Sequence, residues 1–96
     1  MIVTFASKGA RDLYDGVSSK EVLKIPQTIW KVALRKLDMI ESAHSLEDLR
    51  MPPGNKLEAL RSELTGKWSI RINDQYRIIF RFEKENAYEV EIIDYH

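Results

Sequence analysis

The chain has 96 residues, no cysteine, and 15 basic against 15 acidic side chains, so its formal net charge is zero at neutral pH. This length predicts a single domain over residues 1–96, and the lack of cysteine excludes disulfides, thiolate metal sites and cysteine nucleophiles. The sequence has neither a signal-peptide pattern nor an apolar run long enough to span a bilayer, so we expect a cytoplasmic protein with no membrane partner.

The N-terminal half predicts one strand and two helices. Residues 2–7, IVTFAS, are a β-branched and aromatic run typical of a strand. Ser7 is a suitable N-cap for a short helix, and Gly16 is a suitable stop for it. Pro26 suits the first turn of a main helix over residues 26–43. Apolar side chains recur along that helix at helical spacing, namely Ile29, Ala33, Leu37 and Ile40.

Shorter features follow the main helix. Ser45 and Asp48 have the spacing of a capping box, which predicts one helical turn. Residues 51–55, MPPGN, predict an irregular loop, because proline, glycine and asparagine all favour turns. The stretch 56–67 has no clear period, and Gly66 near its end predicts a turn before the next strand.

Three runs with two-residue alternation close the chain, over residues 68–74, 76–83 and 87–95. Short turns join them, so they predict an antiparallel meander with one buried face. The order of a strand, helices and three strands gives an α+β fold, with a small antiparallel-rich sheet packed against the N-terminal helices. The side chains expected on the buried face are Trp68, Ile70, Ile72, Tyr76, Ile78, Phe80, Phe82, Tyr88, Val90 and Ile92.

The opposite face of the predicted sheet carries charged groups that can do chemistry. Alternation places Arg71, Arg77 and Arg81 there, on adjacent strands, where they can form one cationic patch. Tyr95 has the parity to share that face. Residues 83–96 have a net charge of −4, which leaves +4 on the rest of the chain, so a basic surface is compatible with a neutral total.

Arginine, tyrosine and histidine on one exposed face describe an RNA-cleaving site without a metal ion. A base takes the proton of the ribose 2′-OH, arginine stabilises the charge at phosphorus, and an acid protonates the leaving oxygen. Plainer interpretations compete with this one. A single arginine on a sheet surface is most often solvated, a tyrosine near a chain end usually packs, and a terminal histidine is usually disordered.

Longer motifs decide between these interpretations. The stretches DLRMPPGNKLEAL and GKWSIRINDQYRIIFRFE, with the ending EIIDYH, occur in one order and spacing. Together with the opening MIVTFASKGARDLYDG, they resemble the HigB-type toxins of bacterial type II toxin–antitoxin modules, within the RelE/ParE superfamily. The resemblance covers nearly the whole chain.

The resemblance implies a function and partners. It implies a ribosome-dependent endoribonuclease that cuts mRNA in the A site of the 70S ribosome, with no cofactor or metal, and so inhibits translation and growth. It also implies a cognate HigA-type antitoxin, a helix-turn-helix protein through which the complex contacts operator DNA. The alternatives are a ParE-like, non-nucleolytic toxin that inhibits a protein such as gyrase, and an inactive module that acts as a co-repressor.

The resemblance also implies site residues. Arg77 matches the family arginine associated with the scissile phosphate, and the ending Asp94, Tyr95 and His96 matches the C-terminal catalytic group. Which of these residues acts as base and which as acid stays open. Some relatives carry a histidine between residues 56 and 61, where this chain has none. The expected substrate-binding residues are Arg61, Arg71, Gln75 and Arg81.

Overall fold

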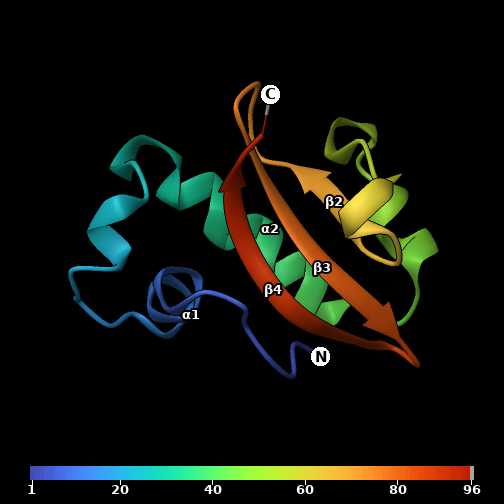
Figure 1. Ribbon diagram of the computed structural model, residues 1–96, viewed down its shortest axis with the longest axis horizontal. Coiled ribbons are helices and arrows are strands. Elements are labelled where there is room, and N and C mark those ends of the chain that lie inside the picture. The colour runs from blue at the N-terminus through green and yellow to red at the C-terminus, as the bar shows by residue number, and fades with distance from the viewer. Residues whose placement is uncertain (96) are drawn as a thin grey trace.

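The computed structural model describes residues 1–95, which fold into one sheet with helices against one of its faces (Figure 1). The four strands are antiparallel and lie in the order β1-β2-β3-β4. The α+β class is therefore confirmed. The strands are β1 Glu58–Ala59, β2 Trp68–Arg71, β3 Tyr76–Glu83 and β4 Asn86–Asp94, and the α-helices are α1 Lys8–Asp15 and α2 Trp30–Ser42.

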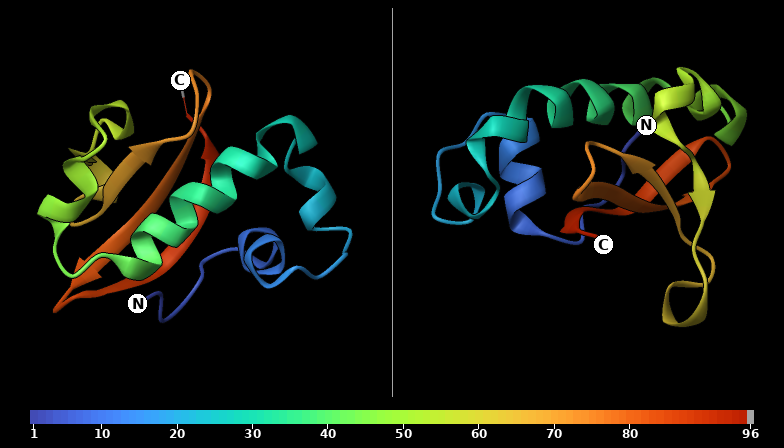
Figure 2. Two further views of the ribbon diagram at one scale, coloured as in Figure 1. Left: turned by 180° about the vertical axis from the view of Figure 1, so that it is seen from behind. Right: turned by 90° about the horizontal axis from the view of Figure 1, so that it is seen from above.

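Helix α2 crosses one face of the sheet (Figure 2). The predicted stripe on this helix is buried, with Ala33, Leu37 and Ile40 each 0% exposed. These side chains belong to the same core as Ile78 and Phe80 of the sheet. The predicted start at Pro26 is early, because Gln27–Ile29 form a 3₁₀ turn before α2 begins at Trp30.

Helix α1 lies beside the end of the sheet, near β4 (Figure 1). The Ser7 hydroxyl accepts the N–H of Ala10 at 3.3 Å, and Gly16 ends the helix in the left-handed region at φ 73°. Both caps are as predicted. Helix α1 also packs closely on the following segment, because a Cβ added at Gly9 would lie 2.9 Å from the carbonyl oxygen of Glu21.

The predicted N-terminal strand over residues 2–7 is wrong as a regular strand. The segment forms only two isolated parallel bridges to β4, Ile2 to Ala87 and Phe5 to Val90. The pairing breaks between these bridges, where the Thr4 hydroxyl accepts the N–H of Glu89. The fourth strand is instead β1, which lies in the stretch 56–67 that has no readable period.

Strand β4 contains a bulge that changes the face of one predicted core residue. Ile79 pairs with Glu91, and Arg81 pairs with Tyr88, so β4 has one extra residue between these pairs. Glu89 accommodates it at φ 55°. Tyr88 therefore lies on the face of Arg81, whose guanidinium carbon is 4.5 Å from the centroid of the tyrosine ring. The prediction that Tyr88 shares the core face is wrong.

The connection between α2 and β1 contains short 3₁₀ turns. The Asp48 carboxylate accepts the N–H of Ser45 at 3.3 Å, and the predicted helical turn is present over Leu46–Arg50. The MPPGN stretch is more regular than predicted, because Pro53–Asn55 form a 3₁₀ turn. Two further 3₁₀ turns are Val22–Lys24 and Ser62–Leu64. Within residues 1–95, no helix is long and apolar enough to cross a membrane.

Candidate active site

Arg77 is buried at the centre of the candidate site. It lies on β3 directly opposite Arg71 of β2, on the sheet face away from α2, and its residue is only 8% exposed. Its Nη1 donates to the hydroxyl of Ser69 and, at 3.3 Å, to the carbonyl oxygen of Lys56. The same atom lies 2.8 Å from Oε1 of Glu58. The predicted face is correct, but Arg77 is enclosed rather than open to solvent.

Tyr95 lies beside this guanidinium, as alternation predicted. The guanidinium carbon of Arg77 is 5.7 Å from the centroid of the Tyr95 ring. The backbone N–H of Tyr95 donates to the carbonyl oxygen of Gln75 at 2.6 Å, so pairing continues one residue beyond β4. The chain is thus held in place up to Tyr95.

A pocket of about 580 Å³ opens next to Arg77, within the roughly 300–1,000 Å³ range typical of ligand sites. It is lined by Glu58, Ala59, Leu60, Arg61 and Tyr95. We call it the Arg77 pocket because two of these lining residues, Glu58 and Tyr95, contact the Arg77 guanidinium, which itself lies outside the lining. Arg61, one of the predicted substrate-binding residues, is therefore in the same pocket as Tyr95. A cation, a phenol and a carboxylate surround one open volume.

Glu58 is a candidate functional residue that the sequence did not reveal. Its side chain is 52% exposed, lines the Arg77 pocket and contacts the guanidinium. A carboxylate in this position can accept a proton from a hydroxyl that is bound in the pocket. The available signal was the histidine that some relatives carry between residues 56 and 61, since Glu58 supplies another proton acceptor in that interval.

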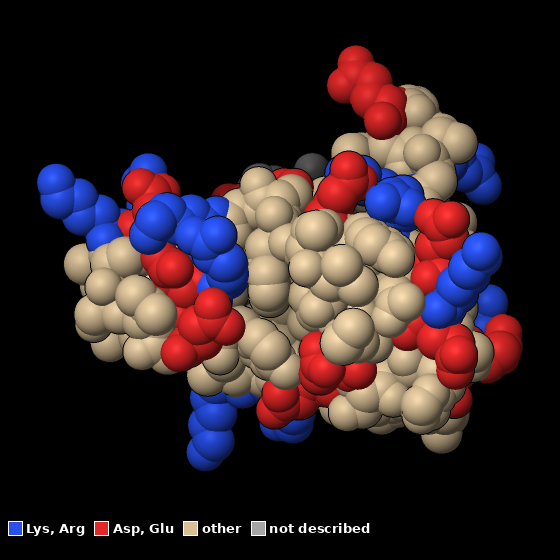
Figure 3. Space-filling model, turned by 90° about the horizontal axis from the view of Figure 1, so that it is seen from below, with Lys and Arg blue, Asp and Glu red and all other residues tan. Residues whose placement is uncertain are grey.

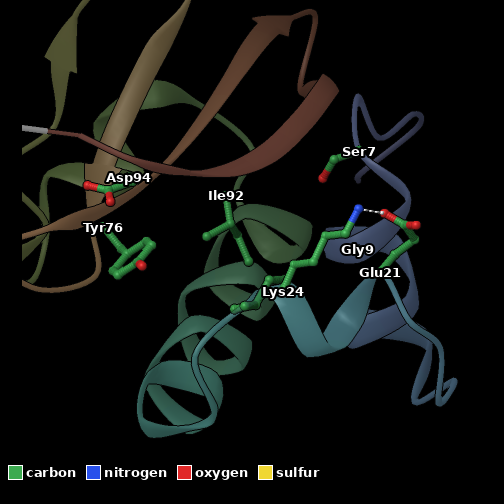
Figure 4. A pocket seen from close by; sticks show the side chains of 8 residues that line it. Ser7, Gly9, Glu21, Lys24, Tyr76, Ile92 and Asp94 are labelled. Atoms are coloured by element: carbon green, nitrogen blue, oxygen red, sulfur yellow. Dashed lines mark hydrogen bonds and ion pairs between the residues drawn. The ribbon is translucent and has the colours of Figure 1, made fainter.

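Asp94 does not share the face of Tyr95. It pairs with Tyr76 across β3 and β4, and its side chain lies on the α1 side of the sheet (Figure 4). There it lines a separate pocket of about 290 Å³. Gln75 Nε2 donates to Oδ2 of Asp94 at 3.0 Å. The structure therefore separates the Asp94 side chain from Tyr95 and Arg77, although Asp94 and Tyr95 are neighbours in sequence. The other residues that line this second pocket are Ser7, Gly9, Glu21, Lys24, Ile25, Tyr76 and Ile92.

The predicted cationic patch is neutralised by carboxylates. Arg71 pairs with Asp74. Arg81 Nη1 lies 2.6 Å from Glu83, and Arg81 Nε lies 3.5 Å from Glu89. On the face of the molecule shown in Figure 3, blue and red side chains are likewise interspersed at both sides of an uncharged centre. A continuous basic surface is therefore the wrong description, and Arg71 and Arg81 do not line the Arg77 pocket.

His96 lies outside the described residues, so its predicted catalytic role stays a prediction. In residues 1–95, no group of three or more histidine, aspartate or glutamate side chains is arranged to hold a metal ion.

Comparison with protein families shows the group to which the chain belongs. A sequence model described as the RelE-like toxin of the type II toxin–antitoxin system HigB matches residues 3–96. The chain belongs to the HigB-like toxin family. The resemblance seen in the sequence is thereby confirmed.

Two curated relatives of this HigB-like toxin carry the name HigB. Toxin HigB-1 of Vibrio cholerae serotype O1 is 39% identical over 82 residues, which cover 85% of this chain and 84% of the relative. Endoribonuclease HigB of Proteus vulgaris is 30% identical over the whole of both chains. An uncharacterised protein of Haemophilus influenzae is 48% identical over 64 residues, and this alignment spans 63% of that protein.

Solved structures share the fold of the HigB-like toxin at low sequence identity. The heterotetrameric YoeB–YefM toxin–antitoxin complex of Staphylococcus aureus contains a chain with a TM-score of 0.60 and 21% identity, with 100% and 98% of the two chains covered. The RelBE2 toxin–antitoxin complex of Mycobacterium tuberculosis gives a TM-score of 0.54 and 20% identity, with 99% and 96% covered. The predicted RelE-like fold is therefore correct.

Proposed function

We propose that this HigB-like toxin is an endoribonuclease that cuts translated mRNA and so inhibits translation and growth. The observation that carries the proposal is the pocket lined by Glu58, Arg61 and Tyr95, because Glu58 and Tyr95 also contact the buried Arg77 guanidinium beside it. These are the groups that cleavage of RNA at a 2′-OH requires. The name of the Proteus vulgaris relative supports the same activity.

In the proposed reaction, Glu58 accepts the proton of a ribose 2′-OH. The 2′ oxygen attacks the adjacent phosphorus, and the bond from phosphorus to the 5′ oxygen breaks. Arg77 stabilises the charge on the non-bridging oxygens, because its planar fork matches two oxygens and keeps its charge. Tyr95 or His96 protonates the leaving 5′ oxygen, which yields a 2′,3′-cyclic phosphate and a 5′-OH. No metal ion takes part in this scheme.

The residues outside the pocket take supporting roles in the proposal. Asp94 faces away from Arg77, so we assign it, with Gln75, to holding the chain end in place rather than to the reacting phosphate. Arg61 lines the pocket and is exposed, so it can bind a neighbouring phosphate. Arg71 and Arg81 are paired with carboxylates, which weakens their predicted role in substrate binding.

We further propose that cleavage depends on the ribosome. The net charge is zero and the arginines of the sheet are paired, so affinity for free RNA should be weak. The 70S ribosome would supply what the site lacks, by holding mRNA in one orientation against Arg77. A HigA-type antitoxin is the proposed partner that neutralises the toxin, and it would contact operator DNA on behalf of the complex. The toxin–antitoxin complexes among the fold relatives support such a partner.

Mapping of mRNA 5′ ends after pulse induction tests the proposed activity. The wild-type protein should cut translated mRNA, and Arg77→Lys should lower cutting by about 10²-fold or more, since a lysine cannot reproduce the bidentate fork. Arg35→Lys, an exposed arginine on α2, is the matched control and should cut normally. Intact mRNA in growth-arrested cells, with equal toxicity of Arg77→Lys, would instead favour the ParE-like inhibition of a protein target such as gyrase.

A further inference from the structure

Lys36 is a buried lysine that the proposed reaction does not use. It lies on α2, is 6% exposed, and its Nζ donates to Oδ1 of Asn55. Burial lowers the pKa of Lys36, and the nearby charges of Arg35 and Arg71 lower it further. Burying an ammonium group costs free energy that a hydrocarbon side chain of similar size would not. Stability of the core therefore gives no reason for a lysine at this position.

The partner of Lys36 is the asparagine of the MPPGN stretch. Asn55 is 0% exposed, and both the oxygen and the nitrogen of its side-chain amide form hydrogen bonds. Its Nδ2 donates to the carbonyl oxygen of Leu49 at 3.1 Å and to that of Met51 at 3.4 Å. The Asn55 side chain thus ties helix α2 to the end of the Leu46–Arg50 turn.

The backbone after Asn55 leads directly to Arg77. Lys56 adopts the left-handed region at φ 45°, which turns its carbonyl oxygen to within 3.3 Å of Nη1 of Arg77. Two residues later, Glu58 places Oε1 2.8 Å from the same atom. Two of the acceptors around Arg77, the Lys56 carbonyl and the Glu58 carboxylate, therefore belong to residues one and three positions after Asn55.

We propose that Lys36 and Asn55 are positioning residues that fix the Lys56 carbonyl and the Glu58 carboxylate around the Arg77 guanidinium. The path runs from Lys36 Nζ to Asn55 Oδ1, through the left-handed turn at Lys56, to Arg77 Nη1. The predicted effect of these two residues on cleavage rests on the proposed function. It also gives the MPPGN stretch a role that a plain turn does not have.

Lys36→Met tests this path, because methionine fills the same space without the donor. Arg35→Met is the matched control, since it removes a cation from the adjacent, exposed position of the same helix. The first readout is hydrogen exchange of the Arg77 guanidinium, which ¹⁵N NMR monitors. Thermal unfolding first checks that each variant is folded. Lys36→Met should speed this exchange clearly, and Arg35→Met should leave it unchanged.

The second readout is single-turnover and steady-state cleavage of ribosome-bound mRNA. A displacement of catalytic groups by about 1 Å can cost up to roughly 10²-fold, so Lys36→Met should lower kcat by about 10-fold or more. KM should change far less, because the groups that bind the ribosome are untouched. Asn55→Ala should act in the same way. The double variant should be no slower than Asn55→Ala alone, because both side chains act along one path.

The inference is overturned if Lys36→Met keeps wild-type guanidinium exchange. It is also overturned if the loss of kcat in Lys36→Met equals the fraction of that variant that is unfolded. The same holds if the loss in the double variant equals the product of the losses in the two single variants. If the wild-type protein cleaves no RNA, the proposed function fails. The exchange readout still decides the positioning inference in that case, since it measures the fold around Arg77 and not the reaction.

Discussion

Replacing Glu58 with glutamine should separate activity from stability more sharply than any other single change at the Arg77 pocket. The Glu58 side chain is 52% exposed, and its ion pair with Arg77 is screened by solvent on one side. Such pairs contribute about 0–1 kcal/mol. Glutamine keeps the shape and still presents an oxygen to Arg77, whose bonds to Ser69 and Lys56 remain. Unfolding free energy should therefore fall by less than about 1 kcal/mol, or at most roughly 4–8 °C in Tm for a domain of this size.

The effect of Glu58→Gln on cleavage should be far larger. A general base contributes about 10²–10⁴-fold, and glutamine cannot accept the 2′-OH proton. Cleavage of mRNA on purified ribosomes should fall by this factor. Glu63→Gln is the matched control, because Glu63 is an exposed glutamate of the same segment that lines neither pocket. Wild-type cleavage by folded Glu58→Gln would refute the role of Glu58 as base.

Three further predictions concern the chain end, the packing of α1 and stability in acid. Deleting His96 should lower mRNA cleavage by about 10-fold or more while Tm stays nearly constant; equal losses of both would mean a structural role. Gly9→Ala should lower stability by about 1–3 kcal/mol in thermal unfolding, because its Cβ meets a backbone carbonyl at 2.9 Å, whereas Gly54→Ala meets nothing within 4 Å and should be neutral. The hydrogen bond from Lys8 lowers the pKa of Asp12 below 3.8, so the Tm advantage of wild type over Asp12→Asn should be constant near neutral pH and shrink as pH falls below that value. An advantage that grows in acid would contradict this assignment.

Local periodicity predicted the helix and strands that bury one face in the core. The apolar stripe from Ile29 to Ile40 is continuous, so it fixes which face of α2 packs on the sheet. Strand β3 was predicted over its observed bounds of Tyr76–Glu83, because alternation and the flanking turns agree there. The two missed strand features lack such a signal. Strand β1 has two residues, Glu58 and Ala59, and owes its conformation to pairing with β2 rather than to its own pattern.

The bulge in β4 could not be predicted from alternation. A single extra residue interrupts the alternation, so Tyr88 on one side of the bulge takes the opposite face to that expected from Val90 and Ile92 on the other side, and only the pairing with β3 reveals it. The Asp94 side chain illustrates the same limit at the candidate site. Alternation itself places Asp94 and Tyr95 on opposite faces, although family resemblance joins them in one catalytic group. The structure follows the alternation.

The sequence by itself determined the family, the α+β class, the caps of α1 and the place of Arg77 on the face away from the core. These features depend on short-range rules or on motifs that are contiguous in the chain. The tertiary structure alone decided that Glu58 meets Arg77, that carboxylates neutralise the arginines, and that Lys36 reaches Asn55. Each of these contacts joins segments that are brought together by sheet pairing and core packing, and no local pattern encodes the distance between them.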